Sequence, residues 1–337
     1  MMMKTLPVVA LCLLTSLDAT APEHAQSYGW AKSTASKGLA TCNADTVRVA
    51  VPAGMLEGSL LCPASAGPWP VVLLIAGSGP TDRNGNSPFV KSNSYRLLAE
   101  ALATRGIASL RYDKRGIGAS SRSIRTEADL RFDMAADDAA AWVRLLRGDA
   151  RFTTTTVVGH SEGSLLGMLA TQRGSADAFV SVAGIGRSAD RVIHEQLMAA
   201  APAPLVADAD RIMALLRAGK TADTVPPALF SLFRASVQPY IISWFKYDPV
   251  VEIRRLRVPV LIVQGTTDIQ VKVQDAQLLG AADNDATVTI IDGMNHVLKT
   301  VPADQSAQMQ SYSDPYLPVN TQLVAVIATF VGSVRRQ

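Results

Sequence analysis

Histidine and cysteine are scarce in this chain of 337 residues, which has four histidines and three cysteines. Neither residue type forms a metal-binding pattern, because the sequence contains no His-Glu-x-x-His and no Cys-x-x-Cys. A glycine-rich phosphate loop is missing as well. These absences exclude the common zinc and nucleotide motifs. We therefore expect no metal site and no cofactor.

The chain also lacks a marked excess of charge of either sign, since 32 basic residues face 29 acidic ones. No dense run of Lys or Arg indicates a groove for nucleic acid, which needs many cations on one face. The hydrophobic fraction of 48% is too high for a disordered chain. We expect one globular α/β domain carrying an insertion, with a small molecule as its partner.

Apolar residues at the N-terminus have the order of an export signal. Lys4 precedes a short apolar run from Leu6 to Leu17, and small residues follow at Ala19 and Ala21. The run is too short to cross a bilayer as a helix. We expect residues 1–21 to be a signal peptide, with a cleavage point as late as about residue 27, and a periplasmic or secreted protein without stable membrane insertion. A buried N-terminal helix is the alternative.

Two cysteines remain once Cys12 leaves with the signal peptide. Cys42 and Cys62 are an even pair in an exported chain, which permits one disulfide. They flank a hairpin predicted over Thr46–Val51 and Ser59–Cys62. Two unpaired buried thiols are the alternative, because a sequence cannot test disulfide geometry.

Strand and helix patterns alternate along most of the chain. Continuous apolar runs at Val71–Ala76 and Val258–Gln264 are typical of strands buried on both faces of a sheet. Further strands are predicted at Ile107–Arg111, Thr154–Val158, Phe179–Ala183 and Ala286–Ile291, and helices at Ser92–Arg105, Leu130–Arg147, Gly163–Gln172, Asp275–Ala282 and Thr321–Val331. This alternation predicts a mostly parallel sheet with helices on both faces, over residues 45–186 and 249–337.

Residues 187–248 interrupt the alternation. They hold helical segments at Val192–Ala200 and Asp210–Ala218, an aromatic-rich stretch, and the helix-breaking pair Pro226 and Pro227. We interpret the segment as a small helical cap over the carboxyl edge of the sheet, where sites lie in open α/β folds. Ordinary peripheral helices are the alternative.

The sequence Gly159-His160-Ser161-Glu162-Gly163 follows a predicted strand and opens a predicted helix. A serine nucleophile at the top of a sheet needs a very tight strand-to-helix turn, and glycines fit where backbones crowd. The turn directs the N–H of Glu162 to the place where negative charge develops. A structural glycine turn with an idle serine is the alternative.

A nucleophilic serine needs a base and an acid that orients it. His296 follows the last predicted strand, whereas His24 lies near the signal, His160 adjoins the serine, and His194 lies in the cap. Asp268 lies a few residues after the strand at 258–264, and we assign it as the acid. The other candidates for the acid are Asp283, Asp285 and Asp292. The order Ser161, Asp268, His296 along the chain is the order expected for α/β-hydrolases.

A second oxyanion donor is expected in Gly77-Ser78-Gly79-Pro80, directly after the strand at 71–76. Its glycines let the backbone approach a substrate, and we assign the donor to the N–H of Ser78. A tight turn without a catalytic role is the alternative. Asp82 and Arg83 are expected to pair and stiffen this loop, with a solvated pair as the plainer possibility.

Together these segments resemble the α/β-hydrolase superfamily over roughly 71–331, and more narrowly bacterial carboxylesterases with G-S-G-P-x-D-R-x-G, R-Y-D-x-R-G-x-G-x-S and G-H-S-E-G segments. Here the segments occupy 77–85, 111–120 and 159–163. The resemblance implies a Ser161, Asp268, His296 triad, a cap at about 187–250 and ester substrates. The chain differs from lipases, which have His-Gly-Gly at the oxyanion loop, because Ala76 holds the histidine place.

We predict a serine carboxylesterase that hydrolyses short- to medium-chain acyl esters through an acyl-enzyme on Ser161. Gly79, Trp244 and Phe245 are the expected substrate contacts, because the cap is apolar and aromatic. A peptidase, amidase or thioesterase with the same triad is the alternative, since one machinery serves all these acyl transfers. A catalytically silent binding protein is a further alternative.

Overall fold

The computed structural model describes residues 45–52 and 54–336. The predicted signal peptide, His24 and Cys42 therefore lie outside the described residues. Cys62 is disulfide-bonded, whereas the partner predicted for it, Cys42, is one of the residues that are not described.

A single sheet of eight strands organises the chain, in the order β1-β2-β4-β3-β5-β6-β7-β8. The strands are β1 (Asp45–Val51), β2 (Gly54–Leu61), β3 (Trp69–Ile75), β4 (Ala108–Tyr112), β5 (Phe152–His160), β6 (Ala178–Val182), β7 (Val260–Gly265) and β8 (Thr287–Ile291). The pairings β1–β2 and β2–β4 are antiparallel, and all others are parallel. The predicted, mostly parallel sheet is confirmed.

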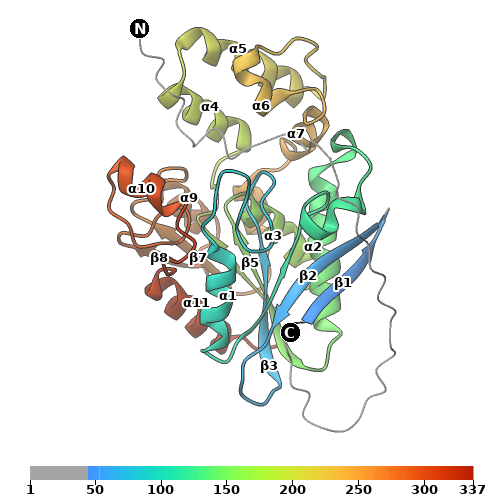
Figure 1. The fold of residues 1–337 in the computed structure, drawn as a ribbon, viewed down its shortest axis with the longest axis vertical. Helices are drawn as coiled ribbons and strands as arrows, with labels where there is room; N and C mark the ends of the chain where they lie inside the picture. Colours follow the sequence, from blue (N-terminus) through green and yellow to red (C-terminus); the bar gives the residue numbers. More distant parts are fainter. Residues whose placement is uncertain (1–44, 53, 337) are drawn as a thin grey trace.

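Helices cover both faces of this sheet (Figure 1). One face carries α1 (Ser94–Ala103) and α11 (Thr321–Ser333), and the other carries α2 (Phe132–Arg147), α3 (Glu162–Gly174), α8 (Pro249–Arg254) and α9 (Val273–Ala282). Alternate residues of β3 explain the two cores, because Val71 and Leu73 join one cluster while Val72 and Leu74 join the other. Burying one such side chain contributes about 1.5–3 kcal/mol, so both faces hold the strands in place.

Four of the helices between β6 and β7 lie above the carboxyl edge of the sheet (Figure 1). They are α4 (Ala189–Ala200), α5 (Ala203–Arg217), α6 (Phe230–Phe233) and α7 (Gln238–Trp244). Their apolar side chains form a separate cluster that includes Leu197, Ile212 and Phe233. Trp244 joins this layer to the core, because its ring stacks on Phe132 of α2 at 5.8 Å. We refer to residues 187–248 as the cap.

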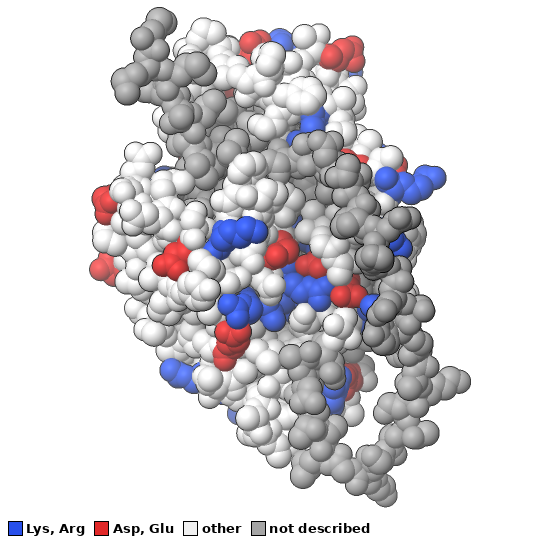
Figure 2. Space-filling view, in the orientation of Figure 1, with Lys and Arg blue, Asp and Glu red and all other residues white. Residues whose placement is uncertain are grey.

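Shorter elements complete the chain: α10 (Gln305–Ser311) and the 3₁₀ turns η2 (Gly118–Ser123), η3 (Glu127–Asp129) and η4 (Pro227–Leu229). None of the helices that the structure describes is long and apolar enough to cross a membrane. On the face shown in Figure 2, Lys and Arg side chains lie beside Asp and Glu side chains across the middle of the molecule.

Candidate active site

Ser161 occupies a strained turn between β5 and α3. Its φ of 56° and ψ of −123° lie outside the usual regions for a residue with a side chain, at a cost of about 1–3 kcal/mol. The flanking glycines are required, because a Cβ on Gly159 would lie 2.2 Å from the carbonyl oxygen of Gly163. A Cβ on Gly163 would lie 2.4 Å from the carbonyl oxygen of Ile75. The turn thus packs directly against β3.

The loops after β7 and β8 bring Asp268 and His296 together. His296 Nδ1 lies 2.8 Å from Asp268 Oδ2, and both side chains are buried. The other carboxylate oxygen, Oδ1, accepts the N–H groups of Gln270 and Val271 at 2.8 and 3.0 Å. The side-chain amide of Gln264 donates to Oδ2 at 3.1 Å. Asp268 therefore has a fixed orientation.

These contacts keep Asp268 ionised. Burial raises the pKa of Asp268, but the charge and hydrogen bond of His296, together with the loop N–H groups, outweigh burial and leave the pKa below its ordinary value. An ionised carboxylate only accepts hydrogen bonds. The Nδ1 of His296 must then carry a proton, which leaves Nε2 as the acceptor in a neutral ring.

Ser161 and His296 line the same cavity, of about 530 Å³ and partly open to solvent. Within the described part of the chain, no hydrogen bond joins the Ser161 hydroxyl to the His296 ring. Such contacts are often loose before substrate binds. The three residues Ser161, Asp268 and His296, predicted from chain order, are thus gathered at one edge of the sheet.

His160 connects the two sides of this site, a role that the sequence analysis did not assign. Its Nε2 lies 2.8 Å from the carbonyl oxygen of His296, and its Nδ1 lies 2.8 Å from the hydroxyl of Tyr95. That hydroxyl also accepts the N–H of Gly77 at 3.1 Å. A carbonyl only accepts, so His160 carries its proton on Nε2, and Tyr95 donates to Nδ1. Burial, followed by the nearby His296, lowers the pKa of His160 to about 3.

Lys114, just after β4, fixes the loop that follows β3. Its ammonium group donates to the carbonyl oxygens of Gly77 and Gly79 at 2.5 and 2.8 Å. In a planar trans peptide the C=O and the next N–H point in opposite directions. The N–H of Ser78 therefore points away from Lys114. Ser78 and Glu162, the two predicted oxyanion residues, line a cavity together with Ser161.

The predicted pair between Asp82 and Arg83 is wrong, because each binds elsewhere. Asp82 Oδ1 accepts the N–H groups of Asn84 and Asn86 at 2.8 and 2.9 Å. The guanidinium of Arg83 pairs with Asp113 at 2.8 Å, and its backbone N–H donates to the same carboxylate. Two carboxyl-edge loops are therefore joined by a nearly buried ion pair.

The side chain of Glu162 is buried next to the nucleophile. Its Oε1 accepts the hydroxyl of Tyr240 from α7 at 2.8 Å. Burial raises the pKa of Glu162, and the charge of Lys114 opposes that rise. Burial likewise lowers the pKa of Lys114, against the charge of Glu162. The charge of each group thus opposes the pKa shift that burial causes in the other.

Two cavities are lined by Ser161, and a third lies beside them. One, of about 420 Å³, is also lined by Glu162 and by apolar side chains of the cap. The other, of about 530 Å³, contains His296. A third, of about 900 Å³ and partly open to solvent, extends between the oxyanion loop and α7. Gly79 lines the third cavity and Trp244 lines the first and third. Phe245 packs against the cap cluster and the core instead, away from these walls.

No group of three or more His, Cys, Asp or Glu side chains is arranged to hold a metal ion, among the residues that the structure describes. His194 of the cap pairs with Asp210 at 2.7 Å. Asp292, the nearest competitor for the acid, is exposed and accepts a hydrogen bond from Thr266.

A profile of the Alpha/beta hydrolase family matches residues 72–308, more than half of the chain. The chain belongs to this family. It is 26% identical over 249 residues to Esterase EstD of Thermotoga maritima. The alignment covers 72% of this chain and 58% of the relative, so the chain spans little more than half the length of that protein.

Solved structures of other alpha/beta hydrolases share the fold. Est1E from Butyrivibrio proteoclasticus, solved with ferulic acid, has a TM-score of 0.54 at 17% identity, over 85% of this chain and 96% of its own. The acylaminoacyl peptidase of Pyrococcus horikoshii has a TM-score of 0.54 at 14% identity, over 89% of this chain and 43% of its own. At identities this low, the likeness supports the fold alone. The predicted fold class is confirmed.

Proposed function

We propose that this alpha/beta hydrolase is a serine carboxylesterase acting on short- to medium-chain acyl esters. The observation that carries the proposal is the buried Asp268–His296 hydrogen bond beside Ser161 on its strained turn. The similarity to Esterase EstD supports an ester as the substrate. The cavity at Ser161 of about 420 Å³, which includes apolar side chains of the cap, supports an acyl group of modest size.

In the proposed reaction, the hydroxyl oxygen of Ser161 attacks the ester carbonyl carbon while Nε2 of His296 takes its proton. Asp268 holds the ring with Nδ1 protonated and stabilises the imidazolium. The tetrahedral intermediate collapses when His296 returns the proton to the leaving alcohol, which leaves an acyl group on Ser161. Water, activated by His296, then hydrolyses the acyl-enzyme and releases the acid.

The N–H groups of Glu162 and Ser78 are the proposed oxyanion donors. Glu162 begins α3, so its N–H is among the free donors at a helix N-terminus. The N–H of Ser78 is directed by Lys114 through the Gly77 carbonyl. Both residues line the cavity that contains Ser161. Donors fixed before the reaction stabilise charge at little reorganisation cost.

The test is hydrolysis of p-nitrophenyl acetate, butyrate and octanoate by the mature protein and by Ser161→Ala. We expect the variant to lose at least about 10⁴-fold in kcat, as removal of a nucleophile does in serine hydrolases. A fluorophosphonate probe should label the parent and not the variant. Equal, feeble rates in both proteins would refute the proposed nucleophile.

The same triad can cleave amides or thioesters, and ester and amide substrates of one acyl group will separate these activities. Faster turnover of the amide at equal concentration would replace the carboxylesterase assignment by a peptidase or amidase. Failure of the probe to label Ser161 would favour the silent binding protein.

We further propose that the chain is exported and acts outside the cytoplasm. The Lys4 and Leu6–Leu17 pattern and the disulfide at Cys62 support this proposal, because disulfides persist in oxidising compartments. Fractionation of cells making the full chain should place the shortened protein outside the cytoplasm. Uncleaved protein in the cytoplasmic fraction would refute it.

A further inference from the structure

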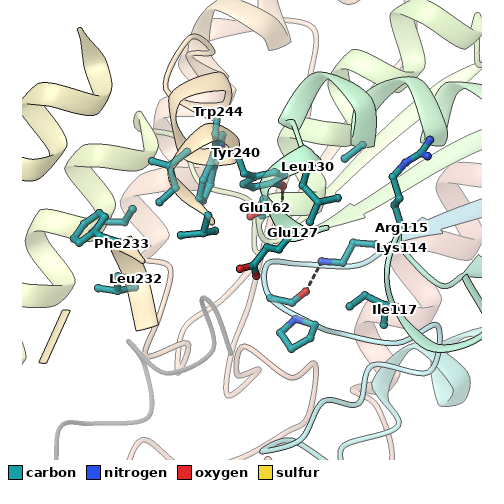
Figure 3. Close-up of a pocket in the computed structure, with 16 residues that line it drawn as sticks. Lys114, Arg115, Ile117, Glu127, Leu130, Glu162, Leu232, Phe233, Tyr240 and Trp244 are labelled. Carbon is teal, nitrogen blue, oxygen red and sulfur yellow. Dashed lines mark hydrogen bonds between the residues drawn. The ribbon is translucent and has the colours of Figure 1, made fainter. Parts of the chain in front are cut away.

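The 900 Å³ cavity adjoins the cavity of about 420 Å³ at Ser161. Both share Glu162, Ile193 and Trp244 as walls. Figure 3 shows Leu232 and Phe233 on one side of the larger cavity, Tyr240 and Trp244 from α7 above it, and Lys114 on the opposite side. We call this larger cavity the distal chamber.

The chemistry of the reaction decides which part of an ester faces the chamber. His296 must give a proton to the leaving alcohol, so the alcohol lies beside His296. The cavity with His296 is the one of about 530 Å³. The cavity that adjoins the distal chamber holds Ser78, Ser161 and Glu162 without His296. The acyl group therefore extends toward the distal chamber.

The charged residues around the chamber are balanced, which selects against a charged ligand. Arg115 is paired with Asp138 at 2.5 Å, and in Figure 3 its guanidinium is turned away from the other lining residues. Glu127 is paired with Arg234 of the cap. Burial lowers the pKa of Lys114 and raises that of Glu162, and the charge of each group opposes the shift of the other. An added charge would lose hydration without gaining an unpaired countercharge.

Glu162 and Lys114 nevertheless retain free hydrogen-bonding capacity. Of the carboxylate oxygens of Glu162, Oε1 binds Tyr240 while Oε2 has no hydrogen-bond partner within the described ranges. The ammonium of Lys114 has three N–H groups, and Gly77 and Gly79 accept from it, leaving a donor. A carboxylate ligand would be repelled by Glu162 and an ammonium by Lys114. A hydroxyl can donate to the first and accept from the second.

We propose that the distal chamber binds the acyl chain of the substrate, and that Glu162 and Lys114 bind a hydroxyl group on that chain. The substrate class is then neutral esters of hydroxylated, otherwise apolar acids. This inference rests on the proposed esterase function and adds a specificity site to it.

Neighbouring residues of α7 provide a matched test of the chamber. Ile241 lines it, whereas Ile242 is half-buried and lies on the cap cluster. In Ile241→Trp we expect the ratio of kcat/KM for p-nitrophenyl octanoate to that for acetate to fall at least about tenfold, because the indole fills the chamber. In Ile242→Trp the ratio should stay within about threefold of the parent. Equal ratios in both variants would overturn the chamber assignment.

The hydroxyl is tested with Glu162→Gln on paired substrates, the p-nitrophenyl esters of 6-hydroxyhexanoate, 8-hydroxyoctanoate and 10-hydroxydecanoate beside their unsubstituted counterparts. For each pair we compare kcat/KM for the hydroxylated ester with kcat/KM for its unsubstituted counterpart, so any damage to the oxyanion donor cancels in the ratio. For the pair with the highest ratio in the parent, we expect the ratio to fall about tenfold in the variant, as for loss of a hydrogen bond to a charged group. An unchanged ratio for every pair would overturn the hydroxyl assignment.

These outcomes separate the inference from the proposed function. If the parent hydrolyses acetate and octanoate and Ser161→Ala does not, the esterase stands whatever the ratios show. If the parent hydrolyses no ester, the function and the inference fail together. If Ile241→Trp does not fold, as judged by thermal unfolding, the paired-substrate ratios decide the question alone.

Discussion

Replacing Lys114 by Met tests whether this side chain aims an oxyanion donor. The substitution keeps most of the side-chain volume and removes the ammonium that donates to the carbonyls of Gly77 and Gly79 at 2.5 and 2.8 Å. Without it, the peptide between Gly77 and Ser78 is free to rotate, and the Ser78 N–H loses its fixed direction. The remaining donor, the N–H of Glu162, is retained because it belongs to α3.

The size of the effect follows from the contribution of one donor. Complete loss of an oxyanion donor reduces kcat by about 10²–10³. The Ser78 N–H is misdirected and still present, so we expect kcat for p-nitrophenyl acetate to fall about 10- to 100-fold in Lys114→Met. KM should change less than about threefold, because the donor acts mainly in the transition state.

Lys91→Met is the matched control, since Lys91 is exposed on a neighbouring loop. Its kcat should stay within about twofold of the parent, as for most surface substitutions. Thermal unfolding of both variants will show whether a loss of activity reflects loss of fold. A folded Lys114→Met variant that keeps its kcat, or one whose KM rises while kcat is unchanged, would show that Lys114 does not orient the Ser78 N–H.

Further predictions concern stability and the turn at Ser161. The folded-state pKa of His160, about 3, lies below its unfolded value of 6.5, so the unfolded chain binds more protons between these values and stability falls as the pH drops through them. Between pH 7 and pH 5 this difference lowers the free energy of unfolding by about 2 kcal/mol. His160→Gln should remove that part of the pH dependence, as measured by urea unfolding at pH 7 and at pH 5. Ser161→Gly should be more stable than Ser161→Ala by about 1 kcal/mol in thermal unfolding, because glycine accepts a φ of 56°; equal stability would mean that the turn is unstrained. Gly163→Ala should lose at least about 100-fold in kcat/KM, since its Cβ would lie 2.4 Å from the Ile75 carbonyl oxygen and force Ser161 to move; retained activity would show that β3 gives way instead.

Strong local patterns explain why most of the sheet was predictable. The buried parallel strands are continuous apolar runs, so β3 and β7 were found within two residues of their observed ends. The entry hairpin was harder, because β2 begins at Gly54 whereas the prediction began at Ser59. Glu57 and Gly58 interrupt its apolar pattern, and Glu57 forms ion pairs with Arg48 and Arg83 that no local pattern reveals.

Chain order identified the residues that the structure places together, because parallel strands end at a common edge. It could not identify partners that depend on three-dimensional contacts. Lys114 belongs to the recognisable segment at 111–120, but the Gly77 and Gly79 carbonyls that it binds lie 37 and 35 residues earlier in the chain. The hydrogen bonds of His160 to Tyr95 and to His296 span 65 and 136 residues. Such roles have no signal in local spacing.

Glu162 links parts of the protein that are usually treated as separable modules. Its main chain belongs to the nucleophile turn, its carboxylate binds the Tyr240 hydroxyl of the cap at 2.8 Å, and its charge is matched to the Lys114 that holds the oxyanion loop. A cap grafted from another hydrolase would therefore leave a buried acid short of a donor, and the disturbance would reach the loop through Lys114. Exchange of the cap to change substrate range should succeed only when the residue at 240, Glu162 and Lys114 are exchanged as one unit.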